Sequence, residues 1–99
     1  MTVRPFELCI QEAELDALRQ RLAQTRWPDR ETVDDWSQGA PLASVMALID
    51  YWHTHYDWRR CERLLNSFAQ YRTELDGLGV HFLHVRSPHA EALPLIITH

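Results

Sequence analysis

The stretch YRTELDGLGVHFLHV, residues 71–85, is the part of this 99-residue chain that decides its fold class. Charged residues alternate with less polar ones over 71–75, which predicts a half-buried strand. The sequence DGLG at 76–79 is typical of a tight hairpin turn, and residues 80–85 are apolar on both faces apart from two histidines. The stretch therefore predicts a β-hairpin whose second strand lies in the middle of a sheet.

Before the hairpin, the apolar residues recur at helical spacing. Leucines three and four residues apart predict an amphipathic helix at 12–23. A second helix is expected from Leu42 to about His55, because its apolar residues also share one face. A third is expected from Asp57, a suitable N-cap residue, to about Asn66.

Two further segments precede or separate these helices. Phe6–Ile10 is expected to be a short strand or an extended arm, and Pro5 confines such a strand to a sheet edge. Residues 26–41 have no period, and we interpret them as an ordered loop pinned by tryptophans. The four tryptophans could line a ligand pocket, but the preferred interpretation is that they are packing anchors: Trp27, Trp36, Trp52 and Trp58.

After the hairpin, Leu93–Thr98 is a continuous apolar run that follows a loop, as expected for a strand covered on both faces. Helices followed by a hairpin and a buried strand are the start of an α/β fold, so we expect an incomplete α/β domain. The expected organisation is a helical region with an extended arm at 1–70 and three strands of a truncated sheet at 71–99.

The composition is that of a soluble globular protein, with 45% hydrophobic and 24% charged residues. The ten basic residues are all arginines interleaved with acids, and the net charge is −4, which argues against a nucleic-acid partner. Cys9 and Cys61 form neither a disulfide framework nor a zinc motif, so a reduced, cytoplasmic setting is expected. No signal-peptide pattern and no membrane-spanning apolar run is found.

The residue types that carry chemistry do not converge in the sequence. His53 and His55 are two apart on a predicted helix, and His81 and His84 are three apart on a predicted strand, so each pair diverges. We therefore expect no metal site. No serine lies in a Gly-x-Ser-x-Gly context, and the three glycines form no phosphate-binding loop. We predict no catalytic residue and no cofactor site within this chain.

The aperiodic landmarks, taken in order, resemble one family. They are Arg26-Trp27-Pro28, Trp36 with Gly39-x-Pro41-Leu42, Tyr51-Trp52, Tyr56-Asp57-Trp58-Arg59, Glu62, Leu65-Asn66, Glu74-Leu75-Asp76-Gly77, His81-Phe82-Leu83-His84-Val85-Arg86-Ser87 and Ala92-Leu93-Pro94-Leu95. The ordered set resembles the N-terminal region of the microsomal-type epoxide hydrolases of the α/β-hydrolase superfamily. The resemblance extends from Pro5 to His99.

The resemblance implies that the parent protein hydrolyses an epoxide to a vicinal diol through an aspartyl ester. A role in detoxification is implied as well. It also implies that His99 begins a His-Gly-Trp-Pro loop of the oxyanion site. The nucleophile, the base and the lid tyrosines would lie outside these residues. The segment would then be a scaffold, inactive alone, whose partners are the rest of the hydrolase core and a small-molecule epoxide, with no membrane involved.

One alternative to this interpretation is a related hydrolase with different specificity, because the substrate-binding lid would lie outside these residues and fold does not fix function. The chain could also be a stand-alone helical protein-interaction module, although such a module is expected to cover or charge an apolar edge like Leu93–Thr98.

We also expect the segment Leu93–Thr98 to pair with another copy of the chain, by edge addition or by exchange. Packing back onto its own hairpin is the other arrangement considered.

Overall fold

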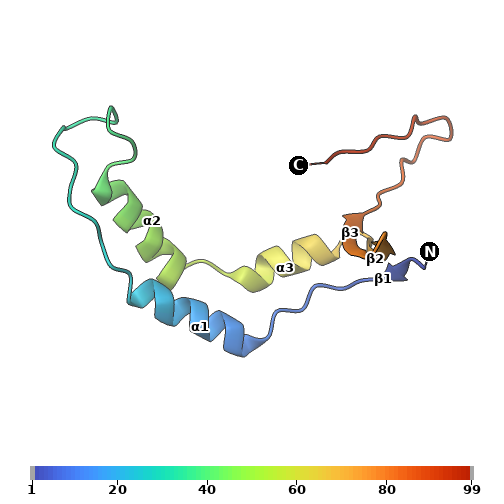
Figure 1. Ribbon diagram of the computed structural model, residues 1–99, viewed down its shortest axis with the longest axis horizontal. Coiled ribbons are helices and arrows are strands. Elements are labelled where there is room, and N and C mark those ends of the chain that lie inside the picture. The colour runs from blue at the N-terminus through green and yellow to red at the C-terminus, as the bar shows by residue number, and fades with distance from the viewer. Residues whose placement is uncertain (1, 99) are drawn as a thin grey trace. The chain divides into compact units, whose positions relative to one another are not determined.

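The computed structural model describes residues 2–98, which form three helices and three strands (Figure 1). In chain order they are β1 (Arg4–Pro5), α1 (Glu12–Ala23), α2 (Leu42–Thr54), α3 (Trp58–Asn66), β2 (Gln70–Leu75) and β3 (Leu78–Leu83). The chain divides into two compact units. The sheet unit contains the residues up to Leu8 and from Glu62 onward, and the helical unit is Cys9–Cys61. Helix α3 begins in the helical unit and ends in the sheet unit.

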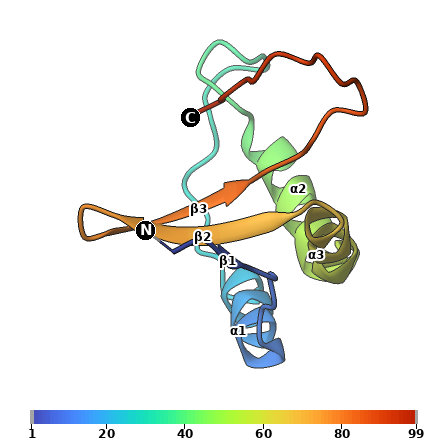
Figure 2. The same ribbon diagram turned by 90° about the vertical axis from the view of Figure 1, so that its right-hand side faces the viewer.

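The sheet unit is built on an antiparallel sheet in the order β1-β2-β3 (Figure 2). Strand β2 is central, because it pairs with β3 along its whole length and with β1 at Arg4↔Arg72 and Pro5↔Tyr71. The predicted hairpin is confirmed. Among residues 2–98 its second strand, β3, has a single neighbour, so these residues alone do not make it central. The N-terminal arm adds to β2 and leaves β3 at an edge. Strand β1 lies at the other edge, where Pro5 is tolerated.

The hairpin turn is formed by two residues, Asp76 and Gly77, between the paired residues Leu75 and Leu78. Both turn residues have positive φ angles, 51° and 80° respectively. Positive φ at both positions belongs to the primed turns, whose twist matches that of paired strands, and Asp-Gly is a preferred sequence for them. The turn therefore sets the register of β2 against β3.

The two faces of the sheet differ in chemistry. On one face, Tyr71 stacks on Phe82 with ring centroids 5.6 Å apart, and the neighbouring cross-strand pair Thr73 and Val80 is half-buried. Alternation along the strands sends the polar residues of β2 to the other face. That face carries Phe6, Gln70, Arg72 and His81.

In the helical unit, α1 has the bounds that the leucine spacing predicts. Arg19 binds Asp16 at 2.7 Å and Glu12 at 3.2 Å on its exposed side. Among residues 2–98, Leu15 is the only apolar side chain classed as buried, with 7% of its surface exposed. The helix ends where the hydroxyl of Thr25 donates a hydrogen bond to a carbonyl of the last turn. Its stability therefore rests on a narrow apolar contact and on local polar bonds.

Helices α2 and α3 also match the predictions, with α2 ending one residue earlier than expected, at Thr54. The carboxylate of Asp57 accepts a hydrogen bond from the N–H of Arg59 at 2.9 Å, which confirms the predicted N-cap. Within the described range 2–98, no helix combines the length and the apolar character that crossing a bilayer requires.

Polar side chains hold the loop between α1 and α2. Gln38 makes two hydrogen bonds with Thr32: its Oε1 accepts from the N–H at 3.0 Å, and its Nε2 donates to Oγ1 at 2.9 Å. Glu31 accepts a hydrogen bond from the N–H of Leu42 at 2.8 Å and so caps α2 from eleven residues away. Trp36 is 66% exposed, so the expectation that it pins the loop is wrong. Hydrogen bonds, rather than aromatic burial, order this loop.

The strand predicted at Leu93–Thr98 is not formed, because the described residues after β3 contain no further strand. The exposed fraction is 90% for Leu93 and 80% for Leu95, and the two isoleucines that follow are 88% and 80% exposed. The segment therefore neither pairs with a strand nor packs back onto its own hairpin. A strand needs a neighbour to satisfy its backbone groups, and an apolar run by itself does not supply one.

We predict that Glu31→Gln abolishes an acid-induced loosening of the loop between α1 and α2. The hydrogen bond from Leu42 N–H, then that from the backbone N–H of Glu31 itself, and the nearby charge of Arg30 hold the pKa of Glu31 below its ordinary value of 4.5. A depressed folded-state pKa stabilises the fold above 4.5, and this contribution is lost as the pH falls through the folded pKa. Hydrogen-exchange protection of the Leu42 amide should thus fall below that pH in the wild-type chain. It should be weaker and nearly independent of pH in the variant.

Asp34→Asn is the matched control for this experiment. Asp34 is fully exposed and forms an ion pair with the Arg30 guanidinium at 3.5 Å. Its removal should leave the protection of the Leu42 amide unchanged. An acid transition that persists in Glu31→Gln would contradict the assignment.

Candidate functional site

Arg59, near the start of α3, holds the N-terminal arm, residues 6–11, within the helical unit. Its Nη1 donates to the carbonyl oxygen of Ile10 at 2.7 Å and its Nη2 to the carboxylate of Glu12 at 3.0 Å. Glu12 also binds Arg19, and hydrogen bonds from Arg59 first and Arg19 second hold the pKa of Glu12 below its ordinary value. Arg59 therefore ties α3 to the arm and to the start of α1 with charge-assisted bonds.

Asn66, the last residue of α3, holds the arm within the sheet unit. Its Oδ1 accepts a hydrogen bond from the N–H of Leu8 at 2.8 Å, and its Nδ2 donates to the carbonyl of Leu8 at 2.7 Å. One side-chain amide thus satisfies both backbone groups of Leu8, as a neighbouring strand would. Nearby, the N–H of Phe6 donates to the carbonyl of Gln70 at 2.8 Å. The expected extended arm at Phe6–Ile10 is confirmed, with the strand itself limited to β1.

Gln70 is 5% exposed and connects Asn66 to the sheet. Its Nε2 donates to the carbonyl of Leu65 at 2.8 Å and to Oδ1 of Asn66 at 3.3 Å. Its Oε1 remains as the acceptor for Nε2 of His81 at 2.9 Å. The hydrogen-bond network therefore assigns a proton to Nε2 of the imidazole. Phe6 packs edge-on against that ring, with centroids 4.9 Å apart.

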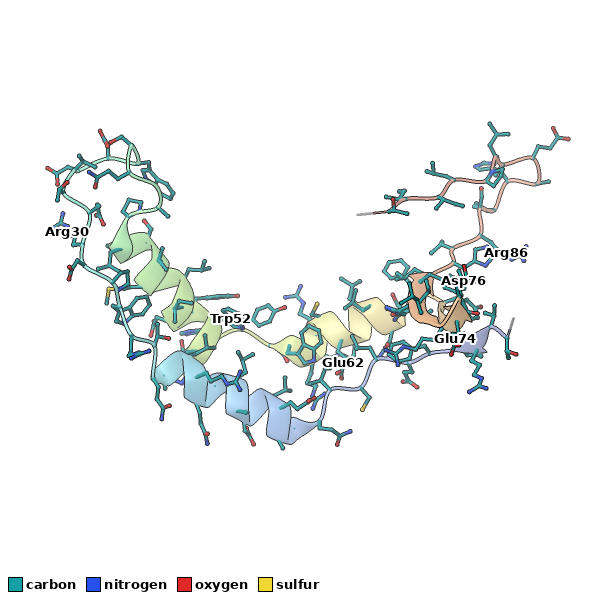
Figure 3. All side chains as sticks on the ribbon, in the orientation of Figure 1. Arg30, Trp52, Glu62, Glu74, Asp76 and Arg86 are labelled. Carbon is teal, nitrogen blue, oxygen red and sulfur yellow. The ribbon has the colours of Figure 1, made fainter. Side chains whose placement is uncertain are left out.

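The helical unit contains an open, mostly apolar cleft of about 570 Å³. Tyr56 lies in its wall, and the hydrogen bond with the thiol of Cys61 raises the pKa of Tyr56. Trp52, labelled at the end of α2 in Figure 3, is 42% exposed and lines the cleft together with Trp58. For Trp52 the prediction of a packing anchor is wrong, because its side chain is exposed. Trp58 is half-buried, and its role as an anchor stays a prediction. The cleft is lined by Leu15, Leu18, Arg19, Leu22, Leu48, Tyr51, Trp52, Tyr56 and Trp58.

The residues singled out for metal or catalytic chemistry remain apart. Across the described part of the chain, no group of three or more metal-ligating side chains comes together. His81 and His84 lie on opposite faces of the sheet, as expected, since one binds Gln70 and the other approaches Tyr71. That no metal or cofactor is used stays a prediction. His99 lies outside the described residues, so its proposed place in an oxyanion loop also stays a prediction.

The sequence predicted the capping role of Asp57, and it contains Arg59 and Asn66 among its landmarks, but it did not predict that they bind the arm. Arg59 and Asn66 are seven residues apart on one helix, two turns, which places both on the same face. Two polar residues at this spacing on a helix, together with an arm of alternating apolar residues, could have predicted that the helix binds the arm. Gln70 offered no such signal, because its polar side chain gives no local indication that it is buried.

A family model described as "Epoxide hydrolase N terminus" matches residues 3–99 of the chain. The chain is 57% identical over 97 residues to the "Putative epoxide hydrolase" of Stigmatella aurantiaca (strain DW4/3-1). It is 31% identical over 102 residues to juvenile hormone epoxide hydrolase 2 of Ctenocephalides felis. These matches cover 98% and 99% of the chain but 22% of each relative, so the chain spans about a fifth of their length.

Solved structures share the fold. The structure of Aspergillus niger epoxide hydrolase superposes with a TM-score of 0.82 at 27% identity, over 93% of this chain and 25% of that one. Juvenile hormone epoxide hydrolase from Bombyx mori superposes with a TM-score of 0.79 over 91% of this chain and 24% of that one. At 21% identity, the second likeness shows the fold alone. These comparisons confirm the α/β fold class, and none of them points to a stand-alone interaction module.

We predict that Asn66→Ala releases the arm from the sheet unit. The change removes two partly buried hydrogen bonds to Leu8, each worth about 1 kcal/mol net, so the free energy of unfolding should fall by roughly 2 kcal/mol. Urea denaturation measures the loss, and limited proteolysis of residues 6–11 should become faster. Gln20→Ala, an exposed change on α1, is the control. Equal stability of the two variants would show that the Asn66 clamp is dispensable.

Proposed function

The chain belongs to the family of epoxide hydrolase N-terminal regions, and from that membership we propose that the protein containing it hydrolyses an epoxide to a vicinal diol. One observation carries the proposal: the family match runs from residue 3 to residue 99, across every landmark motif of the sequence. The chain spans 22% of the relatives' length. The activity is therefore proposed for the whole protein.

Within that protein, we assign these residues the role of a scaffold for the hydrolase core. The polar side chains of Arg59, Asn66 and Gln70 are engaged in hydrogen bonds that hold the arm, α3 and the sheet. Their chemistry is structural. The side chains of Leu93, Leu95, Ile96 and Ile97 are 80–90% exposed and offer a surface that the remaining core would cover.

The reaction implied by the family resemblance has two steps. A carboxylate oxygen of an aspartate attacks an epoxide carbon, the carbon–oxygen bond opens, and the released alkoxide takes up a proton. Water activated by a histidine then attacks the ester carbonyl, which releases the diol and restores the carboxylate. The oxygen added to the substrate thus comes from the aspartate, and water replaces it there. We place His99 at the start of the loop that stabilises the oxyanion of the second step.

An isotope experiment tests this mechanism. In a single turnover of the full-length protein in ¹⁸O-water, the diol should carry no ¹⁸O, because its new oxygen comes from the carboxylate. Label should enter the diol only in later turnovers. A diol fully labelled in the first turnover would exclude the ester route. The 99-residue chain, tested in parallel, should form no diol above background, and turnover by that chain would overturn the scaffold assignment.

We further propose a cytoplasmic setting and a role in the detoxification of reactive epoxides. Both described cysteines are free thiols, which is consistent with a reducing compartment. The net charge of −4 and the pairing of arginines with acids argue against nucleic acid as a partner. No membrane partner is proposed. Fractionation of cells that express the protein would test the setting.

We predict that the 99-residue chain self-associates through Leu93–Thr98. Burial of an exposed Leu or Ile side chain contributes about 1.5–3 kcal/mol, and four such residues are at least 80% exposed in this segment. The outer edge of β3 carries no neighbouring strand among residues 2–98, so a second copy could add there. Light scattering should show dimers or larger species, and Ile96→Glu should shift them to monomers. A wild-type monomer at high micromolar concentration would refute the prediction.

A further inference from the structure

Two arginines face each other across the strands of the sheet unit, and the geometry points to a binding seat for a phosphate-type oxyanion. Arg4 on β1 is the direct register partner of Arg72 on β2. Side chains of directly opposed residues project from the same face, with Cβ atoms about 4.5–5.5 Å apart. The seat is independent of the epoxide chemistry proposed above.

The arrangement is unfavourable unless a negative charge balances it. Like charges directly opposite each other destabilise a sheet. Within residues 2–98, neither Arg4 nor Arg72 is part of the ion pairs, which involve arginines elsewhere in the chain. Glu74, two residues along β2 on the same face, has Gly79 as its partner across the hairpin and makes no ion pair within 4.0 Å there. The positive charge of the pair is therefore open to a ligand.

Arg72 is held ready for such a ligand. Its guanidinium carbon lies 4.7 Å from the centroid of the Phe6 ring, a cation–π contact that restrains the side chain. Phe6 is fixed in turn by its N–H bond to Gln70 and by its edge contact with His81. Stacking leaves the N–H groups at the rim of the guanidinium available for hydrogen bonds. A side chain that is already positioned loses less entropy on binding.

Protection of the sheet edge does not account for the pair. A charge on an edge strand discourages pairing with other chains, which explains an arginine at position 4 of β1. Arg72 lies on the central strand, where no edge needs protection. Edge protection at Arg4 and the Phe6 contact at Arg72 each explain one arginine, but their placement directly opposite each other calls for another explanation. Two guanidinium groups that share an oxyanion supply it, because phosphate oxygens accept bidentate hydrogen bonds from arginine.

Titration of the full-length protein with inorganic phosphate tests the seat. Sodium chloride keeps the ionic strength constant, and the melting temperature and the Nε–H resonances of the arginines are followed. We expect saturable stabilisation by phosphate. Arg4→Ala and Arg72→Ala should each weaken binding by roughly fivefold, the scale of one exposed ion pair. Arg72→Lys should bind with intermediate affinity, since it keeps the charge without the fork.

Arg21→Ala is the matched control, because Arg21 is exposed on α1 in the other unit. Its affinity for phosphate should equal that of the wild type. Arg4→Ala leaves the stack of Arg72 on Phe6 in place, so it remains informative if Arg72→Ala perturbs the arm. Equal phosphate binding by the wild type and both alanine variants, or no effect of phosphate beyond that of chloride, would overturn the proposal.

A second arm distinguishes the source of the phosphate group. Vesicles of phosphatidylcholine with and without phosphatidic acid are sedimented with the protein. Sedimentation that requires both phosphatidic acid and the two arginines assigns the seat to a lipid headgroup. Phosphate binding without such sedimentation assigns it to a soluble phosphate compound.

Discussion

The N–H and C=O groups of an extended arm must find hydrogen-bond partners, and the rest of this structure depends on how that requirement is met. A two-residue strand, β1, covers only Arg4 and Pro5. Beyond it, the side chain of Asn66 takes the place of a neighbouring strand for Leu8, and the guanidinium of Arg59 serves the carbonyl of Ile10. Both partners come from one helix, so the course of the arm is determined by α3. An unpaired backbone group in this partly buried setting would cost about as much as a lost hydrogen bond.

Directional polar bonds here do much of what an apolar core does in larger domains. In residues 2–98 the buried set is small, with Leu15 as its apolar member and Gln70 as its polar one. A hydrogen bond specifies both a partner and a direction, whereas apolar contact is largely non-directional. Gln70 illustrates the result, since its amide nitrogen donates to Leu65 and Asn66 while its amide oxygen accepts from His81. Such a segment can present a defined geometry while much of its apolar surface stays open.

Local signals predicted much of this fold, and distant partners explain what they did not predict. Helices α1 and α3 follow from leucine spacing and from the Asp57 cap, and the hairpin follows from Asp76-Gly77. In contrast, the strand that makes β2 central comes from the opposite end of the sequence. An edge strand or arm was expected there, but no local pattern predicts that β2 is its partner. The apolar run at 93–98 was predicted to be a strand but forms none. Apolar character indicates that a segment favours burial, but it does not provide a neighbouring strand. The roles of Asn66 and Gln70 were not predicted for the same reason, since they depend on partners that are distant in the sequence.

The antiparallel register of β1 and β2 has a consequence for the order of folding. The hairpin joins residues that are adjacent in the chain, with only Asp76 and Gly77 between its first paired residues. The contact of Leu8 with Asn66 spans 58 residues, and that of Thr2 with Thr73 spans 71. Closing a long loop is entropically costly and slow, whereas a hairpin forms in about 1–10 μs. The hairpin and helices would therefore form early, and the arm would be the last segment to join the sheet. The arm is synthesised before the hairpin and the helices but would reach its final position after them.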